Sequence, residues 1–120
     1  MKLGFLTAPF PGVPLETVAK WGSESGFQAI EIACWPLEKA TRRYAGVTHI
    51  DVSTLDKSGA AKIRKMLEGF GLPISALAYY PNPLHPEAEH RERVISHLKK
   101  VIEAAELLEA SGISCRVISM

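Results

Sequence analysis

Residues 26–33 read Gly-Phe-Gln-Ala-Ile-Glu-Ile-Ala, a short and mostly apolar run that is typical of a buried β-strand and carries one carboxylate, Glu31. A helix is expected immediately before this run, because apolar residues recur at helical spacing from residue 15 to residue 22 after Pro14. Gly26 stands where the C-terminus of that helix would be capped. A helix that leads directly into a buried strand is the repeating unit of an α/β fold.

The same alternation extends over the rest of the chain. Short apolar runs predict three further strands, at residues 2–7, 74–80 and 113–119. Helical patterns predict two further helices, at residues 58–70 and from Pro86 to Gly112. The longer helix has an expected apolar stripe of Val94, Leu98, Val101, Ile102, Ala105 and Leu108. Strands that alternate with helices of this length pair in parallel through right-handed crossovers, so we predict an α/β fold with parallel βαβαβαβ units.

The composition indicates one globular domain over residues 1–120, with 47% hydrophobic residues and a formal net charge of +1. This balanced charge disfavours nucleic acid and membrane surfaces as partners. The sequence has neither an expected signal peptide nor a run of 18 apolar residues. Cys34 and Cys115 lie in apolar runs without metal-ligand spacing, which favours buried free thiols in a cytoplasmic protein.

The loops that follow the strands are the expected place for function. In parallel α/β sheets and barrels, ligands bind at the carboxyl edge of the strands. The loops expected there, 8–13, 34–54 and 80–86, carry more aromatic, proline and histidine residues than the connections at the opposite edge. We therefore expect the functional site at the carboxyl edge.

Several of these segments resemble the sugar phosphate isomerase/epimerase superfamily, the xylose isomerase-like (β/α)₈ TIM barrels that also include inosose dehydratases and abasic-site nucleases. The residues that carry the resemblance are Lys2–Thr7 (KLGFLT), Gly26–Ile32 (GFQAIEI), Trp35-Pro36, Leu72–Ala78 (LPISALA) and the helix after His85-Pro86. Such barrels contain about 250 residues, so the resemblance implies the N-terminal half of a TIM barrel.

The resemblance also implies an activity: metal-dependent isomerisation, epimerisation or dehydration of a sugar or polyol. In that family two Glu, one Asp and one His from the second half of the barrel hold Mn²⁺, Mg²⁺ or Zn²⁺. The implication is that this chain contains no metal site and is inactive alone. An alternative is a non-catalytic half-barrel that forms a homodimer or complements a partner chain. A flavodoxin-like domain is a third possibility, which the proline-rich segment 8–14 disfavours.

The sequence assigns no catalytic residue, and five side chains are predicted to bind a sugar or polyol substrate: Glu31, Trp35, Tyr79, Asn82 and His85. Tyr80, in the same loop as Tyr79 and Asn82, is a further candidate for lining the pocket. Glu31 is a carboxylate near the end of an apolar strand, and the resemblance places it in the barrel mouth; pairing with a neighbouring strand is its structural alternative. Trp35 could stack on a sugar or anchor the loop. His85 could present its imidazole to a polyol or cap the next helix.

The other histidines are given mainly structural roles. His49 and Asp51 lie two residues apart in the long loop, where local hydrogen bonding competes with ligand binding. His90 and His97 are separated by two helical turns, roughly 10 Å, so one metal ion cannot bind both directly. We expect this pair at the surface or at a helix contact. Neither a P-loop nor a GxGxxG motif is present, which disfavours nucleotide chemistry.

Overall fold

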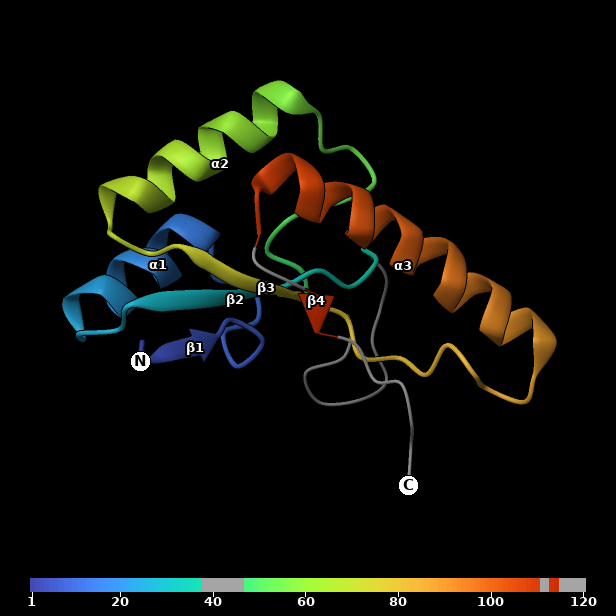
Figure 1. Cartoon of the computed structure of the whole chain (residues 1–120). Coiled ribbons are helices and arrows are strands. Elements are labelled where there is room, and N and C mark those ends of the chain that lie inside the picture. The colour runs from blue at the N-terminus through green and yellow to red at the C-terminus, as the bar shows by residue number, and fades with distance from the viewer. Residues whose placement is uncertain (38–46, 111–112, 115–120) are drawn as a thin grey trace.

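The chain forms a parallel sheet with its helices on one side (Figure 1). The structure is a computed structural model that describes residues 1–37, 47–110 and 113–114. The elements are β1 (Gly4–Leu6), α1 (Leu15–Glu24), β2 (Ala29–Ala33), α2 (Lys57–Gly69), β3 (Ile74–Ala78), α3 (Ala88–Leu108) and β4 (Ile113–Ser114). The four strands lie in the order β1-β2-β3-β4, which confirms the predicted parallel α/β fold.

The two faces of the sheet have different environments. Ile30 and Ile32 of β2 are completely buried in the core that the helices cover. Glu31 lies between them and therefore points to the opposite face, because successive strand side chains alternate. Glu31 pairs in register with Leu6 of β1 and Ala76 of β3. This second face corresponds to the interior of a closed barrel.

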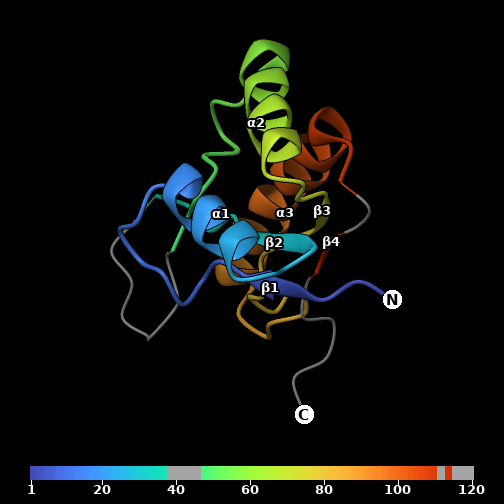
Figure 2. The same cartoon turned by 90° about the vertical axis from the view of Figure 1, so that its left-hand side faces the viewer.

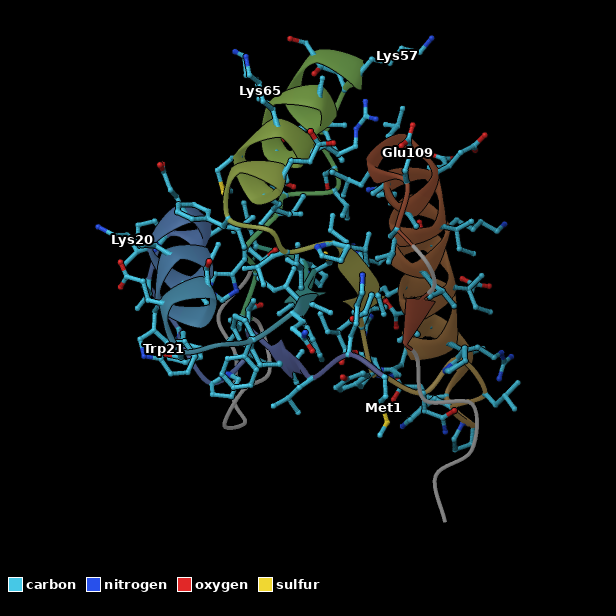
Figure 3. The ribbon with its side chains drawn as sticks, turned by 60° about the vertical axis from the view of Figure 1, so that its left-hand side comes forward. Met1, Lys20, Trp21, Lys57, Lys65 and Glu109 are labelled. Atoms are coloured by element: carbon cyan, nitrogen blue, oxygen red, sulfur yellow. The ribbon has the colours of Figure 1, made fainter. Side chains whose placement is uncertain are left out.

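Helix α1 packs on β1 through aromatic side chains. The ring centroid of Phe5 lies 5.6 Å from that of Trp21 and 4.8 Å from that of Phe27, and Trp21 is labelled beside α1 in Figure 3. Gly22 makes this contact possible, because a Cβ atom at that position would overlap the Phe5 ring. The expected buried face of this helix, which includes Gly22, is confirmed.

The predicted ends of the longest helix are wrong. Helix α3 begins at Ala88 rather than Pro86, because the preceding residues form a turn in which the N–H of Glu87 donates to His85 Nδ1 at 3.1 Å. It ends at Leu108, where Glu109 adopts a left-handed conformation with φ 53°. The predicted cap Gly112 lies outside the described residues, as do Cys115 and residues 115–119 of the expected last strand.

One member of the predicted α3 stripe is also wrong. Ile102 is 51% exposed, because it lies one residue, or about 100°, beyond the buried Val101. His97 and Ala104 occupy the buried stripe instead, at spacings of three or four residues from Val101. Strands β1, β2 and β3 are likewise shorter than the apolar runs from which they were predicted.

Among the residues that the structure describes, no helix is long and apolar enough to cross a membrane.

Candidate functional site

A carboxylate and a phenol meet at the carboxyl edge of β2 and β3. The hydroxyl of Tyr80 donates a hydrogen bond of 2.8 Å to Glu31 Oε1. Tyr80 reaches this face because it lies two and four residues beyond Ala78 and Ala76, which pair with β2 on the same side as Glu31. Burial, the hydrogen bond and the nearby Glu31 charge all raise the pKa of Tyr80 well above its usual range, so its hydroxyl remains a donor.

Trp35 lies beside this pair. Its ring meets the Tyr80 ring edge-on, with 5.3 Å between the ring centroids, and it is half-buried. The chain that returns after residue 46 holds Trp35 in place: the Trp35 N–H donates to the Val47 carbonyl at 3.3 Å, and Cys34 forms an antiparallel bridge with Thr48. An acidic group, a hydroxyl donor and an aromatic ring are thus adjacent.

The end of β1 is tied to the same edge. Thr7 is completely buried, and its Oγ1 accepts a hydrogen bond of 2.9 Å from the Ala33 N–H. The Thr7 N–H donates to the Glu31 carbonyl at 3.0 Å. These bonds fix the backbone that carries Glu31, so that its side chain projects from a rigid strand.

His49 and Asp51 make loop contacts. Nε2 of His49 donates to the Phe10 carbonyl at 3.1 Å and so joins the loops that follow β1 and β2. Burial lowers the pKa of His49, although the carbonyls of Phe10 and Val13 act in the opposite direction. Asp51 Oδ1 accepts from the Ser53 N–H at 3.0 Å within its own turn. Local hydrogen bonding, one of the two alternatives for this pair, is therefore observed for Asp51, whereas His49 bonds to a loop 39 positions away.

The structure brings together two of the five predicted site residues, Glu31 and Trp35, with Tyr80 linking them. Tyr79 is on the helix side of β3, 4% exposed, with its ring centroid 4.5 Å from that of His97. Asn82 Oδ1 accepts from the Leu84 N–H at 2.9 Å.

His85 contributes to the approach to α3. Its Nδ1 accepts from Glu87, its carbonyl accepts from Arg91 at 3.0 Å, and its ring centroid lies 4.2 Å from that of His90. The His85 side chain therefore holds the turn that leads into α3, whereas the N-cap residue of the helix is Glu87. Whether Asn82 and His85 also contact a substrate stays a prediction.

Two features of this edge go beyond the sequence prediction. Tyr79 and Tyr80 were both candidates for pocket lining, and only Tyr80 faces Glu31, a choice that strand alternation would have indicated once the strand end was known. The prediction that His97 lies at the surface or at a helix contact is wrong: it is 7% exposed and its Nε2 lies 2.6 Å from the Cys34 carbonyl. Burial raises the pKa of Cys34 to about 12, so this thiol stays protonated and is no nucleophile at neutral pH.

The described residues do not make a metal centre. Among residues 1–37, 47–110 and 113–114, no three His, Cys, Asp or Glu side chains are grouped so that they could hold an ion. The divalent metal implied by the resemblance therefore does not fit this part of the chain.

Two recesses, of about 340 and 370 Å³, lie at the opposite edge of the sheet, near Pro73 and Ile74. Among the described residues that line the first recess, Lys2 is the only ionisable one. In the second, Arg64 is paired with Glu109 at 2.9 Å; Glu109 is labelled at the end of α3 in Figure 3. Neither recess combines an acid, a hydroxyl and an aromatic ring, so we assign the candidate site to the carboxyl edge.

The parallel strand order and the helices on one face (Figure 2), together with the polar side chains at the carboxyl edge, are those of the first half of a (β/α)₈ barrel. Comparison with protein families agrees: the profile of the xylose isomerase-like TIM barrel matches residues 19–115. The chain belongs to this family. A comparison with curated protein sequences finds no significant match.

Solved structures support the fold. The chain is similar to the probable 3-DHS dehydratase AsbF of Bacillus anthracis, with a TM-score of 0.66, 15% identity, and coverage of 96% of this chain and 38% of that one. A xylose isomerase domain containing protein of Salmonella typhimurium LT2 has a TM-score of 0.65 and 17% identity, and the match covers 99% of this chain and 38% of that one. D-Psicose 3-epimerase of Clostridium cellulolyticum H10, solved with D-tagatose, has a TM-score of 0.65 and 14% identity, and the match covers 96% of this chain and 37% of that one. The chain thus spans less than two fifths of each of these structures.

Proposed function

We propose that the carboxyl edge of β1–β3 binds a sugar or polyol and forms one wall of the site of a sugar isomerase, epimerase or dehydratase. The observation that carries the proposal is the contact of Glu31, Tyr80 and Trp35 on the face that lines a barrel interior. Among the similar structures, an epimerase solved with a sugar supports this class of substrate, and a probable dehydratase supports the class of reaction.

Each of the three side chains has a role that suits a polyhydroxylated ligand. The Glu31 carboxylate accepts hydrogen bonds from ligand hydroxyls, and the Tyr80 phenol, which remains protonated, donates either to Glu31 or to the ligand. The Trp35 ring offers an apolar face to the C–H groups of a sugar. These groups bind and orient the ligand.

The proton transfer at a carbon next to a carbonyl, which such reactions require, is assigned in this proposal to residues beyond this chain, together with the divalent metal. We therefore expect the 120-residue chain to be inactive alone. The buried free thiol of Cys34 supports a cytoplasmic location, where thiols stay reduced. Metal-stimulated epimerase or dehydratase activity of the purified chain would contradict this expectation.

Binding can be tested by the fluorescence of Trp35 in a Trp21→Phe background, with ketohexoses and sugar phosphates as ligands. Loss of a hydrogen bond to a charged group corresponds to about 10–100-fold weaker binding, so Glu31→Gln and Tyr80→Phe should each weaken binding toward this range. Glu24→Gln, which changes an exposed carboxylate on α1, is the matched control. Absence of saturable binding, or equal affinities of Glu31→Gln and Glu24→Gln, would contradict the proposal.

A second candidate function is self-association as a half-barrel. The helices cover one face of the sheet (Figure 2), whereas Leu6 and Ala76 on the other face remain partly exposed, and β1 is an edge strand. Open edges and uncovered apolar faces of parallel sheets favour association. Light scattering on a folded sample tests this candidate: a dimer would support it and a monomer would contradict it.

A further inference from the structure

His97 on α3 makes a buried contact with the chain that carries Trp35. Its Nε2 lies 2.6 Å from the carbonyl oxygen of Cys34. A carbonyl oxygen can only accept, so Nε2 carries the hydrogen. This bond spans 63 positions of the sequence and joins the middle of a helix to the residue immediately after β2.

The N–H of Cys34 is held as well as its carbonyl. Its N–H donates to the Ala78 carbonyl at 2.9 Å, which prolongs the β2–β3 ladder by one step. His97 supplies the donor for the carbonyl at the point where the regular ladder of β2 ends. Because Trp35 is the next residue, this bond fixes the direction in which the chain carries the indole ring.

The ring of His97 contacts the same site a second time. Its centroid lies 4.5 Å from that of Tyr79, and the Tyr79 ring meets Trp35 edge-on at 5.8 Å. Trp35 in turn packs on Tyr80, whose hydroxyl binds Glu31. A continuous series of contacts therefore leads from α3 to the carboxylate of the candidate site.

We propose that His97 is a positioning residue that sets the orientation of Trp35 and, through it, of Tyr80. Its importance for ligand binding rests on the proposed function, but its effect on Trp35 does not. The hydrogen bond requires a donor at the reach of Nε2. Glutamine can place its amide nitrogen at a similar distance from the backbone, whereas asparagine is shorter and leucine has no donor.

The test measures Trp35 without ligand, in the full chain with Trp21→Phe, by near-UV circular dichroism and by acrylamide quenching of its fluorescence. We expect His97→Asn and His97→Leu to raise the quenching constant about twofold or more and to reduce the indole band. His97→Gln should retain the wild-type signals. Val101→Ala, which removes buried packing one turn further along α3, should lower stability and leave Trp35 unchanged.

Three results would overturn the proposal: wild-type Trp35 signals in His97→Asn, failure of His97→Gln to retain them, or an equal change in Val101→Ala. If His97→Leu does not fold, the Asn and Gln variants decide. Sugar titration of the same variants forms a separate arm. Absence of sugar binding by the parent chain would contradict the proposed function, whereas the ligand-free Trp35 signals test His97 alone.

Discussion

Removal of the Tyr80 hydroxyl provides the most direct test of the site's construction. Tyr80→Phe keeps the ring that packs on Trp35 and deletes the 2.8 Å hydrogen bond to Glu31 Oε1. A hydrogen bond to a charged group contributes roughly 1.5–3 kcal/mol, and the half-exposed position of both groups reduces this value through competition with water. We expect the free energy of unfolding to fall by about 1 kcal/mol.

A double-mutant cycle with Glu31→Ala separates the pair from its surroundings. Urea unfolding of the parent, both single variants and the double variant gives the coupling energy between Tyr80 and Glu31. We expect about 1 kcal/mol of coupling, because the double variant loses a bond that each single variant has already lost. Coupling below about 0.3 kcal/mol, the usual limit for independent sites, would refute the contact. Glu31→Ala with Glu24→Ala, an exposed residue of α1, is the additive control.

Tyr80→Phe should also alter the pH dependence of the free energy of unfolding. The pKa of Tyr80 is raised in the folded chain, so the unfolded chain loses this proton first, near the ordinary tyrosine pKa of about 10. The folded state then binds more protons than the unfolded state, and stability falls as the pH rises above about 10. The stability difference between the parent and Tyr80→Phe should narrow in that range. A constant difference in alkaline urea titrations would contradict the raised pKa.

Two further predictions concern packing and burial. Gly22→Ala should lower the free energy of unfolding by about 1–3 kcal/mol, because the added Cβ overlaps Phe5. Gly69→Ala, with open space around the added Cβ, should leave the free energy of unfolding unchanged or raise it by up to about 1 kcal/mol. Equal changes for the two variants in urea unfolding would contradict the α1–β1 packing. In a Cys115→Ser background, Cys34 should react with a disulfide reagent only as the chain unfolds, and rapid labelling of the folded chain would contradict the burial of Cys34. The free energy of unfolding should fall above about pH 9 by up to ~1.4 kcal/mol per pH unit, because the Cys34 thiol ionises first in the unfolded chain.

The order of elements could be predicted from the sequence because each element has its own local signal. The apolar run of β2 follows Gly26, whose φ of 91° is a conformation that glycine adopts without steric cost. The helical spacing that starts at Leu15 predicted the buried side of α1. These signals involve residues close to each other in the sequence, so they can be recognised without tertiary information.

The ends of α3 depend on interactions that periodicity does not report. Pro86 is compatible with a first helical turn, yet the hydrogen bond from Glu87 to the His85 ring selects a turn there, and the helix begins at Ala88. At the other end, Glu109 adopts a left-handed conformation although glycine is the usual residue. Its N–H donates to the Glu106 carbonyl at 3.2 Å, which closes the helix.

The candidate site also has a part that the sequence indicates and a part that only the tertiary structure decides. Glu31 was found because a lone carboxylate in an apolar strand requires a partner, and the structure supplies Tyr80. Tyr80 and Tyr79 are indistinguishable by composition, and only the register of β3 assigns one to the Glu31 face and the other to the helix face. The strand end therefore decides which tyrosine belongs to the site.

His97 shows why a histidine in a helix is difficult to interpret from sequence. Its neighbours on α3 are mostly charged or exposed, so its spacing from Val94 and Val101 was the only indication of burial. Its partner is a backbone carbonyl, which has no sequence signature and lies 63 positions away. A buried ring that donates to the residue before Trp35 couples the outer helix to the inner face of the sheet. The His97 and Val101 variants test whether a substitution on α3 changes Trp35 separately from a general loss of stability.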